Sequence, residues 1–430
     1  MTAIVILNWN GKGFLEKFLP GLLASVGHDP EGGPGEDAEV IVADNASTDG
    51  SREWLRKYCP SVRIVQFRKN HGFTGGYNRA FDILMKDPDN APEYFLLINS
   101  DIEVTDGWLY PLKEWMEYHP ECAVCGPKLH SWYNRDQFEY AGAAGGYLDE
   151  LCYPLCRGRV MDMVEVDEGQ YDDPEDVLWA SGACLMVRSR VWKELKGLDD
   201  RFFAHMEEID FCWRARNAGY RVNVVPRSIV YHVGGGTLPQ NSPFKLKLNY
   251  RNNLLMMQNN LAASCSMLSL YDLLVRDADD FAICTDDYTN CLEVLKEAPE
   301  SFEDSFIEAS VRTGCKLARS RIRLRMFLDC CSALVYLLKG RRDYAKAVRE
   351  AHREFRQLRS PIDPEAIALW LREDLHNGAR CARTVLRLSP EASRNTDKVA
   401  LKGFAEGLIV PLAPLYKERV FDIVDDATGK

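Results

Sequence analysis

The sequence predicts an α/β fold: a mostly parallel sheet with helices on both faces, followed by a helical C-terminal region. From residue 2 to about residue 129, short continuous apolar runs alternate with amphipathic segments. Such runs are typical of parallel strands that helices bury on both faces. Polar clusters directly follow these runs, at the carboxyl ends of the strands, where open α/β sheets bind ligands.

Four strands are expected in this first part of the chain, and the segments between them have helical spacing. A mixed pattern with further strand-like runs continues to about residue 233, and residues 248–275 have a helical pattern. The predicted strands cover residues 3–7, 39–43, 62–67, 94–98, 183–187 and 220–225.

The length of 430 residues favours two or three domains. We expect an α/β domain over residues 1–260 and a helix with an acidic insertion or linker over residues 261–310. A partly basic, helical region is expected over residues 311–430. The acidic side chains are concentrated in residues 277–310.

Composition narrows the class of protein. With 46% hydrophobic and 27% charged residues the chain is neither disordered, collagen-like nor a small disulfide scaffold. The 53 basic and 64 acidic residues give a net charge of −11, which argues against nucleic-acid binding by the whole molecule. The chain opens on a core strand and lacks a run of 18 apolar residues, so we expect no signal peptide and no membrane span. These features predict a cytoplasmic protein.

Fourteen cysteines leave two interpretations open. Cys122 and Cys125, together with Cys152 and Cys156, form two close pairs that could hold a structural zinc ion. The second pair is spaced unusually, so we favour buried thiols in a reducing compartment.

The charge reverses in residues 311–360, which contain 14 Lys and Arg residues against four acidic ones. Within this segment an apolar stretch at residues 333–338 lies between basic flanks. Such a helix could lie at the surface of an anionic membrane. A helical bundle with a solvated basic face explains the pattern equally well, and the tail could also mediate a homodimer.

Polar residues end the first two predicted strands. Asn8 and Asn10 follow the first, and Asp44 and Asn45 follow the second. A carboxylate and an amide there can bind the edge of a base or a ribose. Capping of the next helix explains Ser47 and its neighbours, but it explains Asp44 poorly.

The third strand is followed by a glycine-rich segment, residues 70–79, where a helix begins. Glycines permit close approach of the backbone to a ligand, and a helix N-terminus favours an anion such as pyrophosphate. The spacing of a dinucleotide fingerprint and the lysine of a Walker A loop are absent. A dinucleotide cofactor or a phosphoryl-transfer site is therefore disfavoured.

Acidic residues mark the fourth strand end and a later helix start. Asp101 and Glu103 alternate as on an extended chain, so both could point to one side and bind Mg²⁺ or Mn²⁺. His232 ends another strand and is either a structural histidine or a further ligand. At the start of a helix, capping accounts for one or two of Glu207, Glu208 and Asp210, and a third could act as a general base.

Together these segments resemble glycosyltransferase family 2, especially its bacterial rhamnosyltransferase-like members, which have a GT-A fold. The resemblance covers about residues 2–260. It implies a UDP- or dTDP-linked nucleotide-diphospho-sugar donor, a glycan or lipid-linked acceptor hydroxyl, and inverting transfer with Mg²⁺ or Mn²⁺ in cell-surface polysaccharide synthesis. The segments that match are residues 5–10, 44–50, 70–78, 97–101, 181–188, 202–214 and 231–232.

The resemblance also implies roles for single residues. Glu208 would be the base, with Glu207 as the alternative, because the family's usual Glu-Asp pair is Glu207-Glu208 here. Asp101, Glu103 and His232 would bind the metal ion, more weakly than usual because one Asp of the family's metal motif is missing. The residues that would bind substrate are Asn8, Asn10, Asp44, Asn45, Asn70, Gly72, Phe73, Gly76, Asn78, Asn99 and Asp210.

Two other functions remain possible on sequence grounds. The reduced metal motif permits a catalytically weak or inactive protein that binds sugar nucleotides and assists assembly. A nucleotidyltransferase would share the sheet architecture, but it would need a basic, glycine-rich loop where Asn8, Trp9 and Asn10 stand. A processive synthase is disfavoured because no Gln-x-x-Arg-Trp motif is present.

Overall fold

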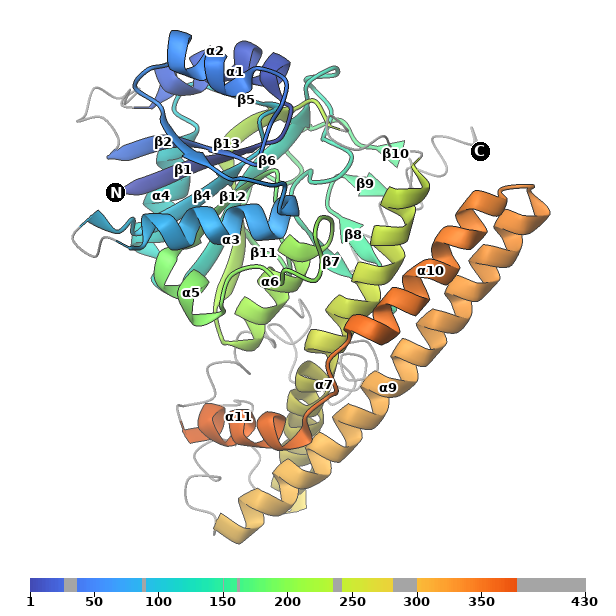
Figure 1. The fold of residues 1–430 in the computed structure, drawn as a ribbon. Coiled ribbons are helices and arrows are strands. Elements are labelled where there is room, and N and C mark those ends of the chain that lie inside the picture. Colours follow the sequence, from blue (N-terminus) through green and yellow to red (C-terminus); the bar gives the residue numbers. More distant parts are fainter. Residues whose placement is uncertain are drawn as a thin grey trace. The chain divides into compact units, whose positions relative to one another are not determined.

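The computed structural model describes two compact units (Figure 1). The sheet unit comprises Met1–Gly146, Leu155–Ala215 and Arg221–Lys245. The helical unit comprises Tyr147–Pro154, Arg216–Tyr220 and the described residues from Leu246 onward. The residues that the structure describes are 1–26, 37–86, 90–149, 151–160, 163–234, 242–280 and 300–376.

A nine-stranded sheet forms the centre of the sheet unit, in the order β11-β13-β6-β12-β4-β1-β2-β3, with β5 paired to β13. Strands β3, β2, β1 and β4 are parallel, and β13 is parallel to β6. Strand β12 runs antiparallel between β4 and β6. The bounds are β1 Thr2–Asn8, β2 Ala38–Asp44, β3 Arg63–Gln66, β4 Tyr94–Ile98, β5 Ile102–Val104, β6 Cys122–Ser131, β11 Glu175–Asp176, β12 Cys184–Arg188 and β13 Arg221–His232.

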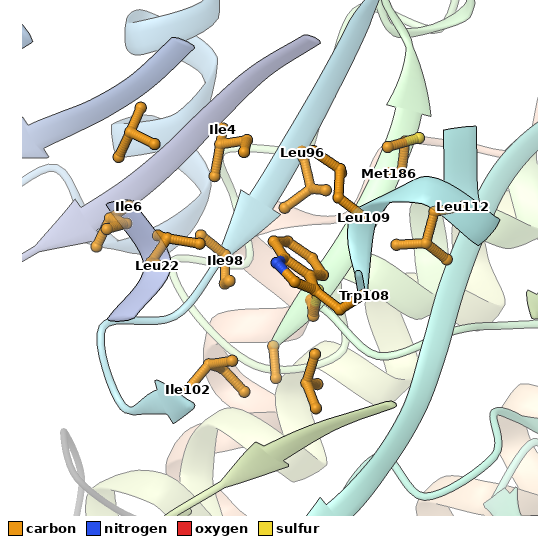
Figure 2. Close-up of a cluster of buried hydrophobic side chains, with 14 of the residues drawn as sticks. Ile4, Ile6, Leu22, Leu96, Ile98, Ile102, Trp108, Leu109, Leu112 and Met186 are labelled. Carbon is orange, nitrogen blue, oxygen red and sulfur yellow. The ribbon is translucent and has the colours of Figure 1, made fainter. Parts of the chain in front are cut away.

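Helices cover both faces of this sheet, as predicted. On one face Ile4 and Ile6 of β1 lie beside Leu96 and Ile98 of β4 and pack with Trp108 (Figure 2). The helices that contribute to this cluster are α1 (Lys12–Ser25), α2 (Ser51–Tyr58) and α4 (Leu109–Tyr118).

The alternate residues of the same strands face the opposite helices. Phe95 of β4 stacks on Phe81 of α3 (Gly72–Leu84) with ring centroids 3.9 Å apart. Trp192 of α5 (Ser189–Glu194) packs edge-on against Phe81. Because successive side chains of a strand point to opposite faces, one continuous apolar run supplies both layers.

A second, four-stranded sheet has the order β10-β9-β8-β7. Its strands lie in the part of the sequence, up to about residue 233, where the pattern of strand-like runs is mixed. Its strands are β7 Gly146–Leu148, β8 Pro154–Cys156, β9 Arg159–Val160 and β10 Met163–Val164.

The helical unit confirms the predicted helical C-terminal region. Asp329 is completely buried in it, where it accepts a hydrogen bond from Arg325 and pairs with His352 Nε2 at 3.0 Å. Residues 281–299 of the acidic segment lie outside the described residues. Within the part of the chain that the structure describes, no helix combines the length and the hydrophobicity needed to span a membrane. The helices are α7 Pro243–Asp280, α9 Glu300–Leu338, α10 Arg342–Leu358 and α11 Pro364–His376.

Candidate active site

The carboxyl ends of β1, β2 and β4 meet at one edge of the sheet. Asn8 at the end of β1 lies opposite Asp44 at the end of β2. Beyond β4, the Asn99 N–H donates a hydrogen bond to the Ala183 carbonyl at the start of β12. Because β12 is antiparallel to β4, the segment before β12 returns to this same edge.

Asp44 is enclosed within the protein. Asn8 Nδ2 lies 3.3 Å from its carboxylate, and the Ser47 N–H donates to Asp44 Oδ1 at 3.1 Å. Arg52 Nε lies 3.7 Å away, and Asp44 has no exposed surface. Asp44 thus closes a turn with Ser47 and does not cap α2, which begins at Ser51 after Gly50. The buried Asn8 Oδ1, by contrast, lacks a hydrogen-bond partner within the described chain.

Amide side chains join the end of β2 to the start of α3. Asn45 Nδ2 donates to Asn70 Oδ1 and to the Gly72 carbonyl, both at 2.9 Å. The His71 N–H donates back to Asn45 Oδ1, also at 2.9 Å. Asn45 and Asn70 thus fix two loops that the sequence predicts to bind substrate. Asn10 joins the loops that follow β1 and β2, because its Oδ1 accepts a hydrogen bond from the Thr48 N–H at 2.8 Å.

The glycines of α3 serve packing in this conformation. A Cβ on Gly72 would lie 2.5 Å from the Phe203 ring, and one on Gly76 would lie 2.6 Å from Leu7 Cδ1. The Phe73 N–H donates to the Phe203 carbonyl at 2.7 Å. The helix N-terminus predicted to hold pyrophosphate is therefore capped by a residue of the protein.

Two further residues that were predicted to bind substrate instead form hydrogen bonds within the protein. Asn78 Nδ2 donates to the Leu198 carbonyl at 2.7 Å, and the Leu198 N–H donates to Asn78 Oδ1 at 2.9 Å. Asp210 is completely buried and accepts from Arg214 Nε at 2.8 Å. Asn78 and Asp210 thus hold the scaffold around the site.

Asp101 and His232 lie together, as the metal hypothesis requires. His232 Nε2 is 3.3 Å from Asp101 Oδ1, and His232 Nδ1 is 3.5 Å from Glu139 Oε1. Burial would lower the pKa of His232, but the nearby carboxylates of Asp101 and Glu139 raise it to about 10. In the absence of a metal ion the two carboxylates thus favour the protonated form of His232, which must lose a proton to become a metal ligand.

Glu139 was not identified from the sequence. Its carboxylate accepts hydrogen bonds from the Ala141 and Gly142 N–H groups at 2.7 and 2.8 Å, and only 6% of the residue is exposed. No local pattern marks it, because its importance comes from its contact with His232, far along the chain.

Glu103 does not join Asp101 and His232. In the pairing of β5 with β13, Glu103 lies opposite Tyr231 and Ile102 lies opposite His232. Successive side chains alternate between faces, so Glu103 and His232 point to opposite sides of the sheet. The Glu103 carboxylate instead accepts from Trp132 Nε1 at 2.7 Å and from Arg135 at 2.8 Å.

Asp101 can contribute to a divalent metal site only together with a ligand's own oxygens. Within the described ranges, no three His, Cys, Asp or Glu side chains are arranged to hold a metal ion. Mg²⁺ is commonly held by one or two carboxylates plus substrate phosphates and water, and the Asp101 carboxylate fits that role.

The alternative interpretation, a structural zinc site, is not supported among the described residues. Cys122, Cys125, Cys152 and Cys156 are buried free thiols. A cysteine must lose its proton to bind zinc. Burial raises the pKa of Cys125 well above the usual value of a thiol, so the neutral thiol is favoured. The burial of all four thiols agrees with the interpretation favoured from the sequence.

Glu207 and Glu208 begin α6 (Glu207–Asn217) and differ in exposure. Glu207 is 4% exposed, whereas Glu208 is only partly buried. A Cβ on Gly182 would lie 3.3 Å from the Glu208 Cβ and 3.7 Å from the Phe73 ring. Glu208 thus lies beside the segment that precedes β12, at the sheet edge described above.

Both carboxyl groups hold their protons more strongly than usual. Burial and the adjacent Glu208 carboxylate raise the pKa of Glu207 well above its usual value, and burial raises the pKa of Glu208 to about 6. Oε2 of each residue lacks a hydrogen-bond partner within the described chain. Glu208, which is half-buried and has a raised pKa, is suited to accept a proton.

The loop before these acids is strained. Phe203, His205 and Met206 all have positive φ, at 66°, 70° and 71°. Such values are costly for residues other than glycine and concentrate at functional sites. The sequence carries no signal for this loop, because it contains no glycine.

Glu207→Gln should raise the stability of the protein above its wild-type value at pH 8. A carboxyl whose pKa is raised by folding binds its proton more tightly in the folded state, so stability falls as pH rises above about 4.3, the usual pKa of Glu. Glutamine mimics the protonated form, so the variant should melt higher at pH 8 and like the wild type near pH 4. Thermal melting across this range measures the difference. A lower melting temperature at pH 8 would contradict the prediction.

Comparisons with known proteins find a matching family model and several relatives. The model of the family described as "Glycosyl transferase family 2" matches residues 3–172. The N-acetylglucosaminyl-diphospho-decaprenol L-rhamnosyltransferase of Mycobacterium tuberculosis is 25% identical over 243 residues, covering 54% of this chain and 76% of that protein. The dTDP-rhamnosyl transferase RfbF of Shigella flexneri is 21% identical over 236 residues, covering 52% of this chain and 72% of that protein.

Among solved structures, S. aureus TarS 1–349 in complex with UDP-GlcNAc is 15% identical with a TM-score of 0.43, covering 83% of this chain and 92% of that one. The family match covers the segments that end in Asn8, Asp44 and Asp101. Residues 3–172 thus match a glycosyltransferase family 2 domain, and the chain is similar to bacterial rhamnosyltransferases.

Proposed function

We propose that the protein transfers a sugar from a UDP- or dTDP-linked donor to a hydroxyl group of a glycan or lipid-linked acceptor, with inversion and with Mg²⁺ or Mn²⁺. One observation carries this proposal: Glu208, a half-buried residue whose carboxyl group has a raised pKa, lies at the sheet edge that also carries Asp101. Glu208 is suited to remove the proton from the attacking hydroxyl group. Asp101 is suited to hold a cation that stabilises the leaving diphosphate.

The nucleotide would lie at the ends of β1, β2 and β4. Asn8 offers an unpartnered, buried acceptor there, and Asn99 follows β4. Asp44, Asn45 and Asn70 would shape this part of the site through the hydrogen bonds that hold its loops. Phe73, beside Glu208, would contact the sugar.

The reaction would be a single displacement. Glu208 accepts the proton of the acceptor hydroxyl, whose oxygen forms a bond to the anomeric carbon. The bond from that carbon to the diphosphate oxygen breaks on the opposite side, and the diphosphate leaves with the bonding electron pair. A divalent cation held at Asp101, with His232 next to it, would neutralise the developing charge on the diphosphate.

A lipid-linked acceptor would place the reaction at the inner face of the cytoplasmic membrane, consistent with the cytoplasmic location expected from the sequence. The relative from Mycobacterium tuberculosis is named for a diphospho-decaprenol acceptor. The acceptor hydroxyl would then belong to a sugar on a polyprenyl diphosphate or a similar carrier.

The alternative function, a catalytically weak sugar-nucleotide-binding protein, is favoured by one contact. His232 Nε2 lies 3.3 Å from Asp101 Oδ1 and competes with a metal ion for that carboxylate. Such a protein would bind the donor without cleaving it.

A thermal-shift screen of UDP- and dTDP-sugars, with and without Mn²⁺, tests the proposal. A ligand at 100 times its Kd stabilises the folded state by about 2.7 kcal/mol, so a true donor should raise the melting temperature by several degrees, and more with Mn²⁺. Donor hydrolysis or transfer is then measured. Stabilisation without either reaction supports the alternative function, and no stabilisation by any sugar nucleotide overturns both.

A further inference from the structure

One face of α9 carries an unbroken stripe of exposed side chains. Along the helix they follow one another at intervals of three or four residues, which places them on a single side. The first four members are basic and the later ones are Phe, Cys and Leu. The members are Arg312, Lys316, Arg319, Arg323, Phe327, Cys331, Leu334 and Leu338, and together they are called the α9 face.

The apolar side chains of the α9 face are largely exposed to solvent. Phe327 is 64% exposed and Leu338 is 80% exposed. Leu334 and the adjacent Val335 and Leu337 are also about half exposed. The opposite side of the helix is buried, and it includes Ile322 and Asp329. The helix therefore packs on the protein with one side and presents a large apolar surface with the other.

The exposed charge of this segment has one sign. From Arg312 to Arg342 the sequence contains a single acid, Asp329, and its carboxylate is buried with Arg325 and His352. Lys339, Arg341 and Arg342 are exposed and follow the apolar half. The apolar surface thus lies between two groups of exposed cations.

A second copy of the chain does not complement this face. A parallel copy would bring the four basic residues against the same four residues. An antiparallel copy would bury arginine side chains against Phe327 and Leu334. An anionic bilayer offers what each half requires, because its head groups are negative and its acyl chains accept apolar side chains.

We propose that the α9 face docks on the surface of an anionic lipid bilayer. The helix lies along the interface, with Phe327, Leu334 and Leu338 inserted at the boundary between head groups and acyl chains. The basic residues on either side contact the head groups. The proposal concerns attachment alone and does not depend on the reaction proposed above.

Co-sedimentation of the full chain with vesicles tests this surface. The protein should bind vesicles that contain phosphatidylglycerol, bind phosphatidylcholine vesicles weakly, and dissociate as salt is raised. Each basic residue near an anionic surface strengthens binding about fivefold. The double variant R319Q/R323Q should therefore lose more than tenfold in affinity, and F327S/L334S should lose binding to a similar extent.

Matched controls use exposed residues elsewhere in the helical unit. Arg356→Gln on α10 and Leu369→Ser on α11 remove a comparable charge and a comparable exposed apolar side chain, and both should bind like the wild type. Circular dichroism and melting temperature check that every variant is folded.

The proposal is overturned if the protein does not bind the anionic vesicles. It is also overturned if the two α9 double variants fold normally and bind as tightly as the wild type. A lipid-free dimer that cross-links through Cys331 upon oxidation, and that F327S/L334S converts to a monomer, also overturns it in favour of a second copy.

Discussion

Replacing Glu208 with glutamine should reduce sugar transfer by about 10²- to 10⁴-fold, the usual contribution of a general base, while donor affinity remains near that of the wild type. Glutamine keeps the size of the side chain beside Gly182 and Phe73 but cannot accept a proton. The transfer rate at saturating substrate and the donor Kd from titration calorimetry separate the two effects. Unchanged turnover would remove Glu208 from the role of base.

Glu207→Gln is the matched control because it removes the neighbouring carboxylate and leaves Glu208 in place. It should retain transfer within a few-fold of the wild type. If Glu207→Gln abolished transfer and Glu208→Gln did not, the two roles would be reversed, an alternative that the sequence left open.

The pH profile supplies an independent signature of the base. Glu208 must be deprotonated to accept a proton, and burial raises its pKa to about 6. The kcat/KM of the wild type should therefore rise about tenfold per pH unit below pH 6 and level off above it. The residual activity of Glu208→Gln should lack this rise.

The parts of the fold that depend on local pattern were predictable. The apolar run of β1 supplies Ile4 and Ile6 to one helical layer and Val5 and Leu7 to the other, as expected for a strand buried on both faces. Because β1 and β2 are parallel neighbours, the polar residues that end them, Asn8 and Asp44, necessarily meet.

The parts that depend on register were not predictable. The expectation that Asp101 and Glu103 point to one side assumed an extended chain through both residues. Instead the chain turns at Asp101, and β5 begins only at Ile102. The pairing of β5 with β13 then decides where Glu103 points, and nothing in the local sequence fixes that pairing.

Contacts between distant segments were equally hidden. Glu139 matters because it reaches His232, and Phe203 matters because its carbonyl caps α3 in place of a ligand. Both contacts join segments far apart in the chain. The glycines at 72 and 76 gave a clear signal of close approach, but the approaching groups are Phe203 and Leu7 rather than a substrate.

Asp101→Asn should remove most of the metal-dependent activity. A metal ion at a leaving group supplies several kcal/mol, so transfer should fall by about 10³-fold if Asp101 holds the ion. Asparagine keeps an acceptor for His232 but loses the charge that attracts a divalent cation. Transfer rate against Mn²⁺ concentration, together with the additional stabilisation that Mn²⁺ gives to the donor complex, measures the loss.

Glu103→Gln is the control that tests the register of β5. The Glu103 carboxylate faces Trp132 and Arg135 on the side away from His232, and its ion pair with Arg135 is partly exposed, so its loss should cost at most about 1 kcal/mol of stability. The Mn²⁺ dependence of this variant should match that of the wild type. If Glu103→Gln weakened the response to Mn²⁺ and Asp101→Asn did not, the ion would be bound on the other side of the strand, and the placement of the leaving diphosphate beside Asp101 would be wrong.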